Sequence, residues 1–360
     1  MPAPPPPRPS SSATWATGGC VVSPAATVAP SRKAALGVCK VRFQKDGVLR
    51  VPRGYVGALQ STRSRRNRFN HAMPGALALS FGMLGCDLHC AYRQNWFTSQ
   101  TLRDGDATAI PREYRRGGDR RARRDARRPD PRLRHTTSRS SPPSGPWKSF
   151  ARAKRQGSCC AYVSNGNATP EVLAYIRPWV DALQGRPEVV RDKALPRARA
   201  RRSRTSSTRS ARIHALGFWL ECLTLVIPGF NDSDEELRDA GEIHRFRLPD
   251  IPWHVTAFHP DYKMDRTPPT PASPRFGAPA RSARSEGLRF VYAGNIPGRR
   301  GRLGEHPAVP AVRRPWSSAG ASSSPRIACL DGRCFHCGET IPGRWEEAGR
   351  RRRSKSRFQS

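Results

Sequence analysis

The chain has 360 residues and a formal net charge of +36, with 64 lysines and arginines against 28 aspartates and glutamates. This length allows one large α/β barrel or two ordinary domains. Ten cysteines in a chain of this size do not indicate a secreted disulfide scaffold, and their C-x3-C and C-x2-C spacings suit metal or cluster ligation in a reducing compartment. The N-terminus lacks the apolar segment of a secretory signal, and the apolar run from Pro74 to Leu84 is too short to cross a bilayer. These features predict a cytoplasmic protein without a membrane span.

The N-terminal part of the chain predicts disorder followed by a hairpin. Residues 1–35 are rich in proline, alanine and serine, a composition that buries too little apolar surface to fold. Residues 36–60 alternate apolar and polar side chains around the dipeptide Asp46–Gly47. Because this dipeptide favours a tight turn, the pattern predicts a β-hairpin within an N-terminal region of residues 36–70.

The next block predicts a buried strand and a loop. The apolar run from Ala76 to Met83 has the continuous pattern of a buried strand, and residues 84–102 follow it as a loop and the start of a helix. Residues 103–158 show no usable period, so no element is predicted there.

A strand and a capped helix are expected beyond this gap. Residues 161–166 predict a short strand that ends in a turn. Thr169 and Pro170 are typical of the N-cap and the first position of a helix, which we expect to run to Val180.

The remaining pattern continues the alternation of strands and helices. Residues 184–212 are again rich in arginine and serine, whereas residues 217–229 form the near-continuous apolar run of a parallel-sheet strand. Residues 231–237 begin a helix with acidic residues at its N-terminus, and strands are expected within 251–262 and 287–295. Strands and helices in alternation predict the α/β class, as a (βα) barrel or an open sheet.

Two cysteines on the loop after the first buried strand indicate metal chemistry. Cys86 and Cys90 have C-x3-C spacing, and Tyr92 and Arg93 follow them. This loop resembles the cluster loop of radical S-adenosylmethionine (SAM) enzymes, C-x3-C-x-aromatic-C. Three thiolates on such a loop hold three irons of a [4Fe–4S] cube and leave the fourth iron open for SAM. Arg93 stands at the third cysteine position, and its guanidinium stays protonated and cannot ligate iron.

Further blocks extend the resemblance, and they occur in family order over a little under half of the chain. They are residues 73–75, 94–96, 163–166, 169–171, 225–232, 253–260, 292–295 and 331–334. Together they are similar to the radical SAM enzyme of the AmmeMemoRadiSam system, a relative of the pyruvate formate-lyase activating enzymes. The resemblance implies a partial (βα) barrel over residues 71–298, in which 103–158 and 184–212 depart from the family pattern.

The resemblance also implies an activity and its partners. The family cleaves SAM reductively to methionine and a 5′-deoxyadenosyl radical, with the cluster as the electron source. The implied partners are a protein or small-molecule substrate, an electron donor and the AmmeMemo-system proteins. Because Arg93 replaces the third ligand, we expect this activity to be impaired.

Site residues are carried over position by position. Cys86 and Cys90 match cluster ligands, Tyr92 matches a contact to the adenine, and Ser164 and Asn165 match residues that line the SAM site. His254 matches a SAM-proximal histidine. Without the resemblance, a histidine on a strand is more often a hydrogen-bonded core residue, and a Ser-Asn-Gly sequence is more often a simple turn.

The C-terminal region contains half of a zinc knuckle. Cys334 and Cys337 have C-x2-C spacing within residues 327–345, which makes them candidate zinc ligands. The second pair that the subgroup has upstream is missing here. Residues 299–326 and 346–360 are predicted as a basic linker and a basic tail.

The charge is concentrated in arginine-rich segments that allow three interpretations. They could bind nucleic acid as a non-enzymatic protein on a relict fold, but they lack the interleaved aromatic residues of a stacking platform, so specific binding is not expected. They could be solvated linkers. We favour a third interpretation, in which the reading frame of a family member was shifted and then restored, so that these segments replace family sequence. Long structureless inserts are unusual inside a compact barrel, which supports this interpretation.

Overall fold

A computed structural model describes the chain in separate stretches, and every structural statement below concerns these residues. They are residues 20–22, 29–31, 37–45, 48–50, 55–63, 69–74, 76–107, 112–113, 133–136, 147–166, 168–185, 210–233, 235–237, 250–270, 288–295, 332–333 and 339–345.

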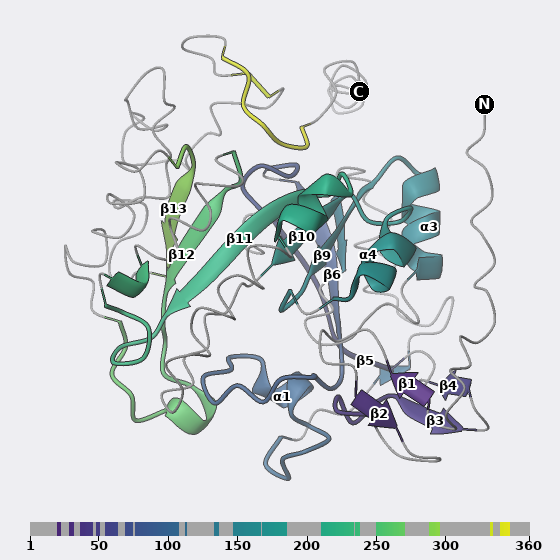
Figure 1. Cartoon of the computed structure of the whole chain (residues 1–360), viewed down its shortest axis with the longest axis vertical. Coiled ribbons are helices and arrows are strands. Elements are labelled where there is room, and N and C mark those ends of the chain that lie inside the picture. The colour runs from purple at the N-terminus through teal and green to yellow at the C-terminus, as the bar shows by residue number, and fades with distance from the viewer. Residues whose placement is uncertain are drawn as a thin grey trace, which may run out of the picture.

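A nine-stranded sheet organises the described residues (Figure 1), in the order β13-β12-β11-β10-β9-β8-β6-β5-β7. Its strands are β5 (Tyr55–Arg63), β6 (Leu77–Met83), β7 (Arg112–Glu113), β8 (Leu133–Thr136), β9 (Cys159–Val163), β10 (Ala182–Gly185), β11 (Trp219–Val226), β12 (Trp253–Ala257) and β13 (Val291–Gly294). Two small antiparallel pairs lie apart from it, β1 (Cys20–Val22) with β2 (Ala29–Ser31) and β3 (Phe43–Lys45) with β4 (Val48–Arg50). The pairing of β3 with β4 across residues 46–47 confirms the predicted hairpin.

The α/β prediction is confirmed by a run of seven parallel strands. Neighbours in the order β6, β8, β9, β10, β11, β12 and β13 all pair in parallel, whereas β7, which lies between β6 and β8 in the chain, pairs antiparallel with β5. This sequential order is the winding of (βα) barrels, whereas doubly wound sheets reverse direction at a switch point. The carboxyl ends of all seven strands therefore meet at one edge of the sheet, called here the carboxyl edge, and their amino ends meet at the amino edge.

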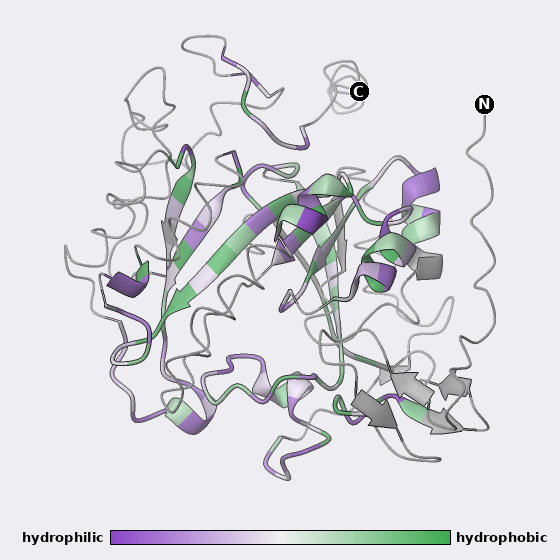
Figure 2. Ribbon diagram, viewed as in Figure 1, coloured by the Kyte–Doolittle hydropathy of each residue, from purple (hydrophilic) through white to green (hydrophobic). Residues whose placement is uncertain are grey.

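The two faces of the sheet pack into different core clusters. On β9, Cys160 and Tyr162 pack into the larger core cluster with residues of the covering helices, while Ala161 and Val163 pack into a second cluster of several alanines and Phe69. This alternation follows from the two-residue period of a strand. Figure 2 shows both colours on α3 (Trp147–Arg155) and α4 (Pro170–Ile176), as expected for helices that cover one face of a sheet.

Helix α4 begins where the sequence predicts and ends earlier. The Thr169 side chain accepts a hydrogen bond from Val172 N at 3.4 Å, which confirms the N-cap. The helix ends at Ile176 instead of Val180, because Pro178 has no N–H to continue the hydrogen-bond ladder.

Elements also occur where the sequence shows no period. Strands β7 and β8 and helix α3 fall within residues 103–158, and β8 joins β6 to β9. Strand β8 has only four residues, Leu133–Thr136, which is too short for a recognisable alternation. No helix in the described stretches combines the length and the hydropathy needed to cross a membrane.

Candidate functional site

The cysteine loop, residues 84–107, leaves the carboxyl edge at the end of β6. It contains the short helix α1 (Trp96–Ser99), which lies at the lower end of the sheet in Figure 1. Segments that follow three other strands reach this loop. Asn165 lies beyond β9, Phe230 beyond β11, and the 3-10 helix η2 (Tyr262–Met264) beyond β12. The carboxyl edge therefore gathers four separate parts of the chain around the two cysteines, which is the edge where barrel-type enzymes bind ligands.

Cys86 is fully buried, and its sulfur lies against Arg93. The Arg93 Nη1 atom donates to Cys86 Sγ at 2.8 Å, and Leu88 N donates to the same sulfur at 3.3 Å. Burial raises the pKa of the Cys86 thiol, and the guanidinium of Arg93 opposes this rise. Cys90 is partly exposed on the same loop.

The residues present do not fit a three-thiolate [4Fe–4S] site. The loop carries two thiols, and the third position holds a guanidinium that donates to one of them. In the described stretches, no group of three or more His, Cys, Asp or Glu side chains is placed to hold a metal ion. A permanently protonated guanidinium supplies no lone pair to iron.

The predicted SAM-site residues beyond β9 lie beside the cysteine loop. Asn165 Nδ2 donates to Asp87 Oδ1 at 2.7 Å, so this side chain holds the residue that follows Cys86. The Ser164 hydroxyl accepts from Gly166 N at 3.1 Å, the contact expected of a simple turn. The Tyr92 ring lies 6.3 Å from the ring of Phe230, centroid to centroid. Asn165 therefore contacts the loop that carries Tyr92. The roles of both residues toward SAM stay predictions.

An aromatic contact that the sequence did not single out joins η2 to the loop. The rings of Trp96 and Tyr262 stack with centroids 5.2 Å apart, and Trp96 Nε1 donates to Asp261 Oδ1 at 3.0 Å. The Tyr262 hydroxyl donates to Asp104 Oδ2 at 2.6 Å. The His-Pro-Asp-Tyr run directly after a buried strand was the available signal, since such polar runs at a carboxyl edge contribute to sites.

His254 lies at the opposite end of the strands. It is the second residue of β12 and pairs in register with Leu223 and Tyr292, near the amino edge. The carboxyl end of β12, Ala257, is three residues further on, about 10 Å at roughly 3.3 Å per residue. His254 contacts the Glu221 carboxylate, which lies 2.7 Å from its Nε2, and its ring stacks on that of Tyr292. This placement matches a hydrogen-bonded core histidine.

Glu221 is the centre of a buried polar network at the amino edge. Its carboxylate is fully buried and accepts four hydrogen bonds, from Asn70 N, His71 N, Trp219 Nε1 and His254 Nε2, at 2.7–3.1 Å. Burial alone would raise the pKa of Glu221, but the hydrogen bond and charge of His254 outweigh it and hold the pKa below its ordinary value. One carboxylate therefore ties the segment before β6 to β11 and β12.

His71 extends this network to the C-terminal segment. Its Nε2 lies 2.5 Å from the Tyr292 hydroxyl and its Nδ1 lies 2.7 Å from Pro342 O. The backbone of Arg344 pairs with the same stretch, since Met73 N donates to Arg344 O and Arg344 N donates to His71 O, both at 2.7 Å. Residues 339–345 (yellow, top of Figure 1) thus close the amino edge.

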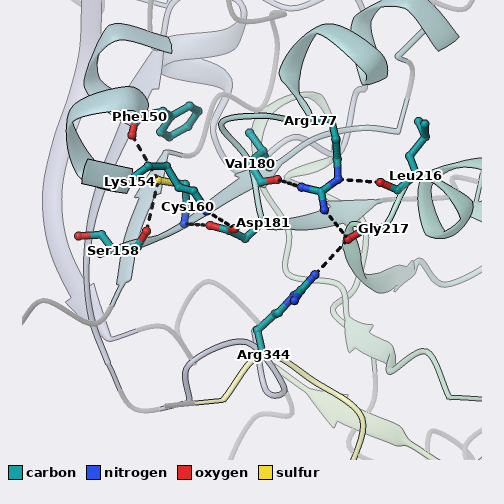
Figure 3. Close-up of polar contacts among 10 residues, drawn as sticks. All are labelled: Phe150, Lys154, Ser158, Cys160, Arg177, Val180, Asp181, Leu216, Gly217 and Arg344. Atoms are coloured by element: carbon teal, nitrogen blue, oxygen red, sulfur yellow. Dashed lines mark hydrogen bonds and ion pairs between the residues drawn. The ribbon is translucent and has the colours of Figure 1, made fainter. Parts of the chain in front are cut away.

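Two arginines and an aspartate fasten this edge from outside (Figure 3). Arg177 Nε donates to Leu216 O at 2.6 Å, and Arg344 Nη2 donates to Gly217 O at 3.1 Å. Asp181 accepts from Cys160 N at 2.8 Å and from Lys154 Nζ at 2.5 Å. These contacts satisfy backbone groups at the ends of helices and strands and give the edge a structural role. The candidate zinc ligands Cys334 and Cys337 lie outside the described residues.

The network predicts that the fold loses stability in acid. Burial lowers the pKa of His71, so below about pH 6.5 the unfolded chain takes up a proton that the folded chain does not. The lowered pKa of Glu221 adds a second loss below about pH 4.5. We expect the urea midpoint to fall between pH 7.5 and 5.5 and again below pH 4.5.

A pair of histidine variants tests this assignment. His71→Gln should flatten the upper part of the profile, while His214→Gln, on an exposed position, should leave it unchanged. An equal slope in both variants would exclude His71 as the source.

Sequence comparison gives a partial relative. No family model matches the chain. A stretch of 87 residues is 40% identical to the uncharacterized protein MJ0808 of Methanocaldococcus jannaschii, and it covers 24% of this chain and 26% of that protein. The chain therefore matches about a quarter of that relative's length.

Structural comparison gives distant similarities. A domain of pyruvate-formate lyase-activating enzyme from Bacteroides vulgatus aligns with a TM-score of 0.32 and 13% identity, over 41% of this chain and 88% of that chain. A radical SAM methyltransferase from Sphaerobacter thermophilus gives 0.37 and 14%, over 61% and 66%. QueE from Escherichia coli gives 0.33 and 14%, over 56% and 92%. These TM-scores are too low to carry an argument about function.

Proposed function

We propose that this chain is a radical SAM-type protein whose cysteine loop no longer completes its [4Fe–4S] site. The observation that carries the proposal is the contact of Arg93 Nη1 with Cys86 Sγ at 2.8 Å, on a loop at the carboxyl edge. The two cysteines and Tyr92 have the spacing of the family loop, and the third ligand position presents a charge to the sulfur where the family presents a thiolate.

Electrostatics explain why the substitution is severe. The guanidinium of Arg93 stays protonated at every working pH, and SAM carries a positive sulfonium. Two cations close together repel each other, and in a partly buried site the low local dielectric makes this repulsion stronger than in water. The unmodified chain, with Arg93, therefore holds no stable cluster and cleaves no SAM. The remaining residues of the proposed site are Cys86, Cys90, Tyr92, Ser164 and Asn165.

The proposal includes partners that the family implies. A protein or small-molecule substrate, an electron donor and the AmmeMemo-system proteins are the proposed partners, in the cytoplasm, and a zinc ion at Cys334 and Cys337 is a proposed second metal. We do not include His254 among the SAM contacts, since it bonds to Glu221 at the amino edge.

Restoring the third cysteine tests the proposal. Anaerobic reconstitution of the chain as written should yield little iron and sulfide, whereas Arg93→Cys should bind about four of each per chain and show a reduced-cluster EPR signal. Release of 5′-deoxyadenosine from SAM should appear only in Arg93→Cys. The matched control is Arg93→Ser, which removes the guanidinium without adding a thiolate and should remain without a full cluster.

One result would overturn this account. If the chain as written already holds a full cluster and releases 5′-deoxyadenosine as fast as Arg93→Cys, another residue supplies the third ligand. Cys39 is the first to examine, because it is buried in the same apolar cluster as Met83 and Leu84, where β6 ends and the loop begins. Loss of the cluster in Cys39→Ser would then identify it.

A further inference from the structure

The turn after β12 contacts both arms of the cysteine loop. Lys263 N donates to Ala91 O at 3.1 Å, and Ala91 directly follows Cys90 in the chain. Further along the loop, beyond Arg93, Tyr262 stacks on Trp96 and donates to Asp104. The loop is therefore held at a point beside its second cysteine and at two points beyond it.

Tyr262 adopts a backbone conformation that its residue type disfavours. Its φ is +56°, in the left-handed region, where a bulky side chain is uncommon and costly. Such strain persists only where surrounding contacts determine it, and three such contacts surround this residue. They are the ring of Trp96, the carboxylate of Asp104, and His89 Nε2 at 3.3 Å from the hydroxyl.

The electrostatics of the contact agree with its geometry. Burial and the hydrogen bond to Asp104 raise the pKa of Tyr262 to about 12, and the same hydrogen bond lowers the pKa of Asp104. The tyrosine therefore stays a neutral donor, and the aspartate stays an ionised acceptor. Lys263 Nζ, 3.5 Å from Asp104 Oδ2, adds a charge partner to the same carboxylate.

We propose that Tyr262 is a positioning residue that fixes the Cys90 half of the cysteine loop, with its ring as the support for Trp96 and its hydroxyl as the tie to Asp104. The consequence for a cluster rests on the proposed function, whereas the ordering of the loop does not. The side chain acts through His89 and Trp96, which flank Cys90 and Arg93 in the chain.

The rate at which Cys90 is alkylated, in the reduced protein that retains Arg93, measures how firmly the cysteine loop is held. The main variant is Tyr262→Asn, because asparagine tolerates the left-handed region and removes the ring and hydroxyl without adding backbone strain. We expect its urea midpoint to be unchanged and Cys90 to react about tenfold faster with iodoacetamide, the change expected when an aromatic pair and a hydrogen bond no longer oppose loop opening. Tyr262→Phe, which keeps the stack, should give an intermediate rate.

Two controls separate this role from general destabilisation. Tyr175→Leu, on the exposed side of α4, should leave Cys90 unchanged, and buried Cys222 should stay unreactive in every variant. An unchanged Cys90 rate in Tyr262→Asn, or an equal rise at Cys222, would overturn the proposal.

The same variant in the Arg93→Cys background tests the consequence for the cluster. Tyr262→Asn should lower the iron retained through gel filtration, and Tyr175→Leu should not. If Arg93→Cys alone holds no cluster, the proposed function fails, but the alkylation rates still decide the role of Tyr262.

Discussion

Replacing Glu221 with alanine is expected to lower the free energy of unfolding by about 3–5 kcal/mol, because removing one partner of a buried polar pair leaves the others without compensation. The four donors that Glu221 accepts from would face an apolar gap at the amino edge. Glutamine is no conservative replacement. Each carboxylate oxygen accepts two hydrogen bonds, so an amide NH2 in either orientation would point at two donors.

Equilibrium urea unfolding followed by circular dichroism checks this expectation. Glu235→Ala is the matched control, since Glu235 lies exposed and should change stability by no more than about 0.5 kcal/mol. A loss below about 1 kcal/mol in Glu221→Ala would contradict the network as described, because so small a cost is typical of an exposed pair.

The second large effect is expected at Gly85, the residue before Cys86. Its φ is +81°, and a Cβ there would lie 2.5 Å from Cys39 O and closer still to the side chain of Val41. Gly85→Ala combines a left-handed conformation with a clash against backbone, so we expect a loss of about 3 kcal/mol or more in the free energy of unfolding. A displaced loop should also expose Cys86 to alkylation.

Two other glycines separate the components of this effect. Gly229 has a φ of +69° and open space around its Cβ position, so Gly229→Ala should lose only the conformational part, about 1–2 kcal/mol. Gly105 has neither feature, and Gly105→Ala should be neutral within about 0.5 kcal/mol. If all three variants lose the same stability, the clash of a Cβ at position 85 with Cys39 O and Val41 is not the cause.

Local chemistry explains what the sequence predicts well. The Thr169 cap and the apolar run from 217 to 229 depend on residues close in the chain, and both appear as expected in α4 and β11. The cysteine loop falls at the carboxyl edge because it follows β6 directly. These predictions need only periodicity, capping and the direction of a strand.

The rest depends on contacts between distant residues. Of the four partners of Glu221, two are backbone amides 150 and 151 residues away and a third is the side chain of His254, and no local pattern predicts such a set. Tyr262 looks like a loop residue in the sequence, and its role appears only when Trp96 and Asp104 lie beside it. The amino-edge position of His254 follows from the strand register, which periodicity does not give.

The long sequence separation of the loop's contacts sets the order in which the protein can assemble. Asn165 binds the loop from 78 residues away, and Asp261 and Tyr262 bind it from 158–173 residues away. Closing such large loops lowers the chain entropy before the new contacts stabilise the fold, so these contacts form late in folding. On the ribosome, Cys86 and Cys90 emerge long before the residues that hold them. The two thiols therefore spend much of synthesis uncovered, and their protection begins only when β12 and the turn after it have joined the sheet.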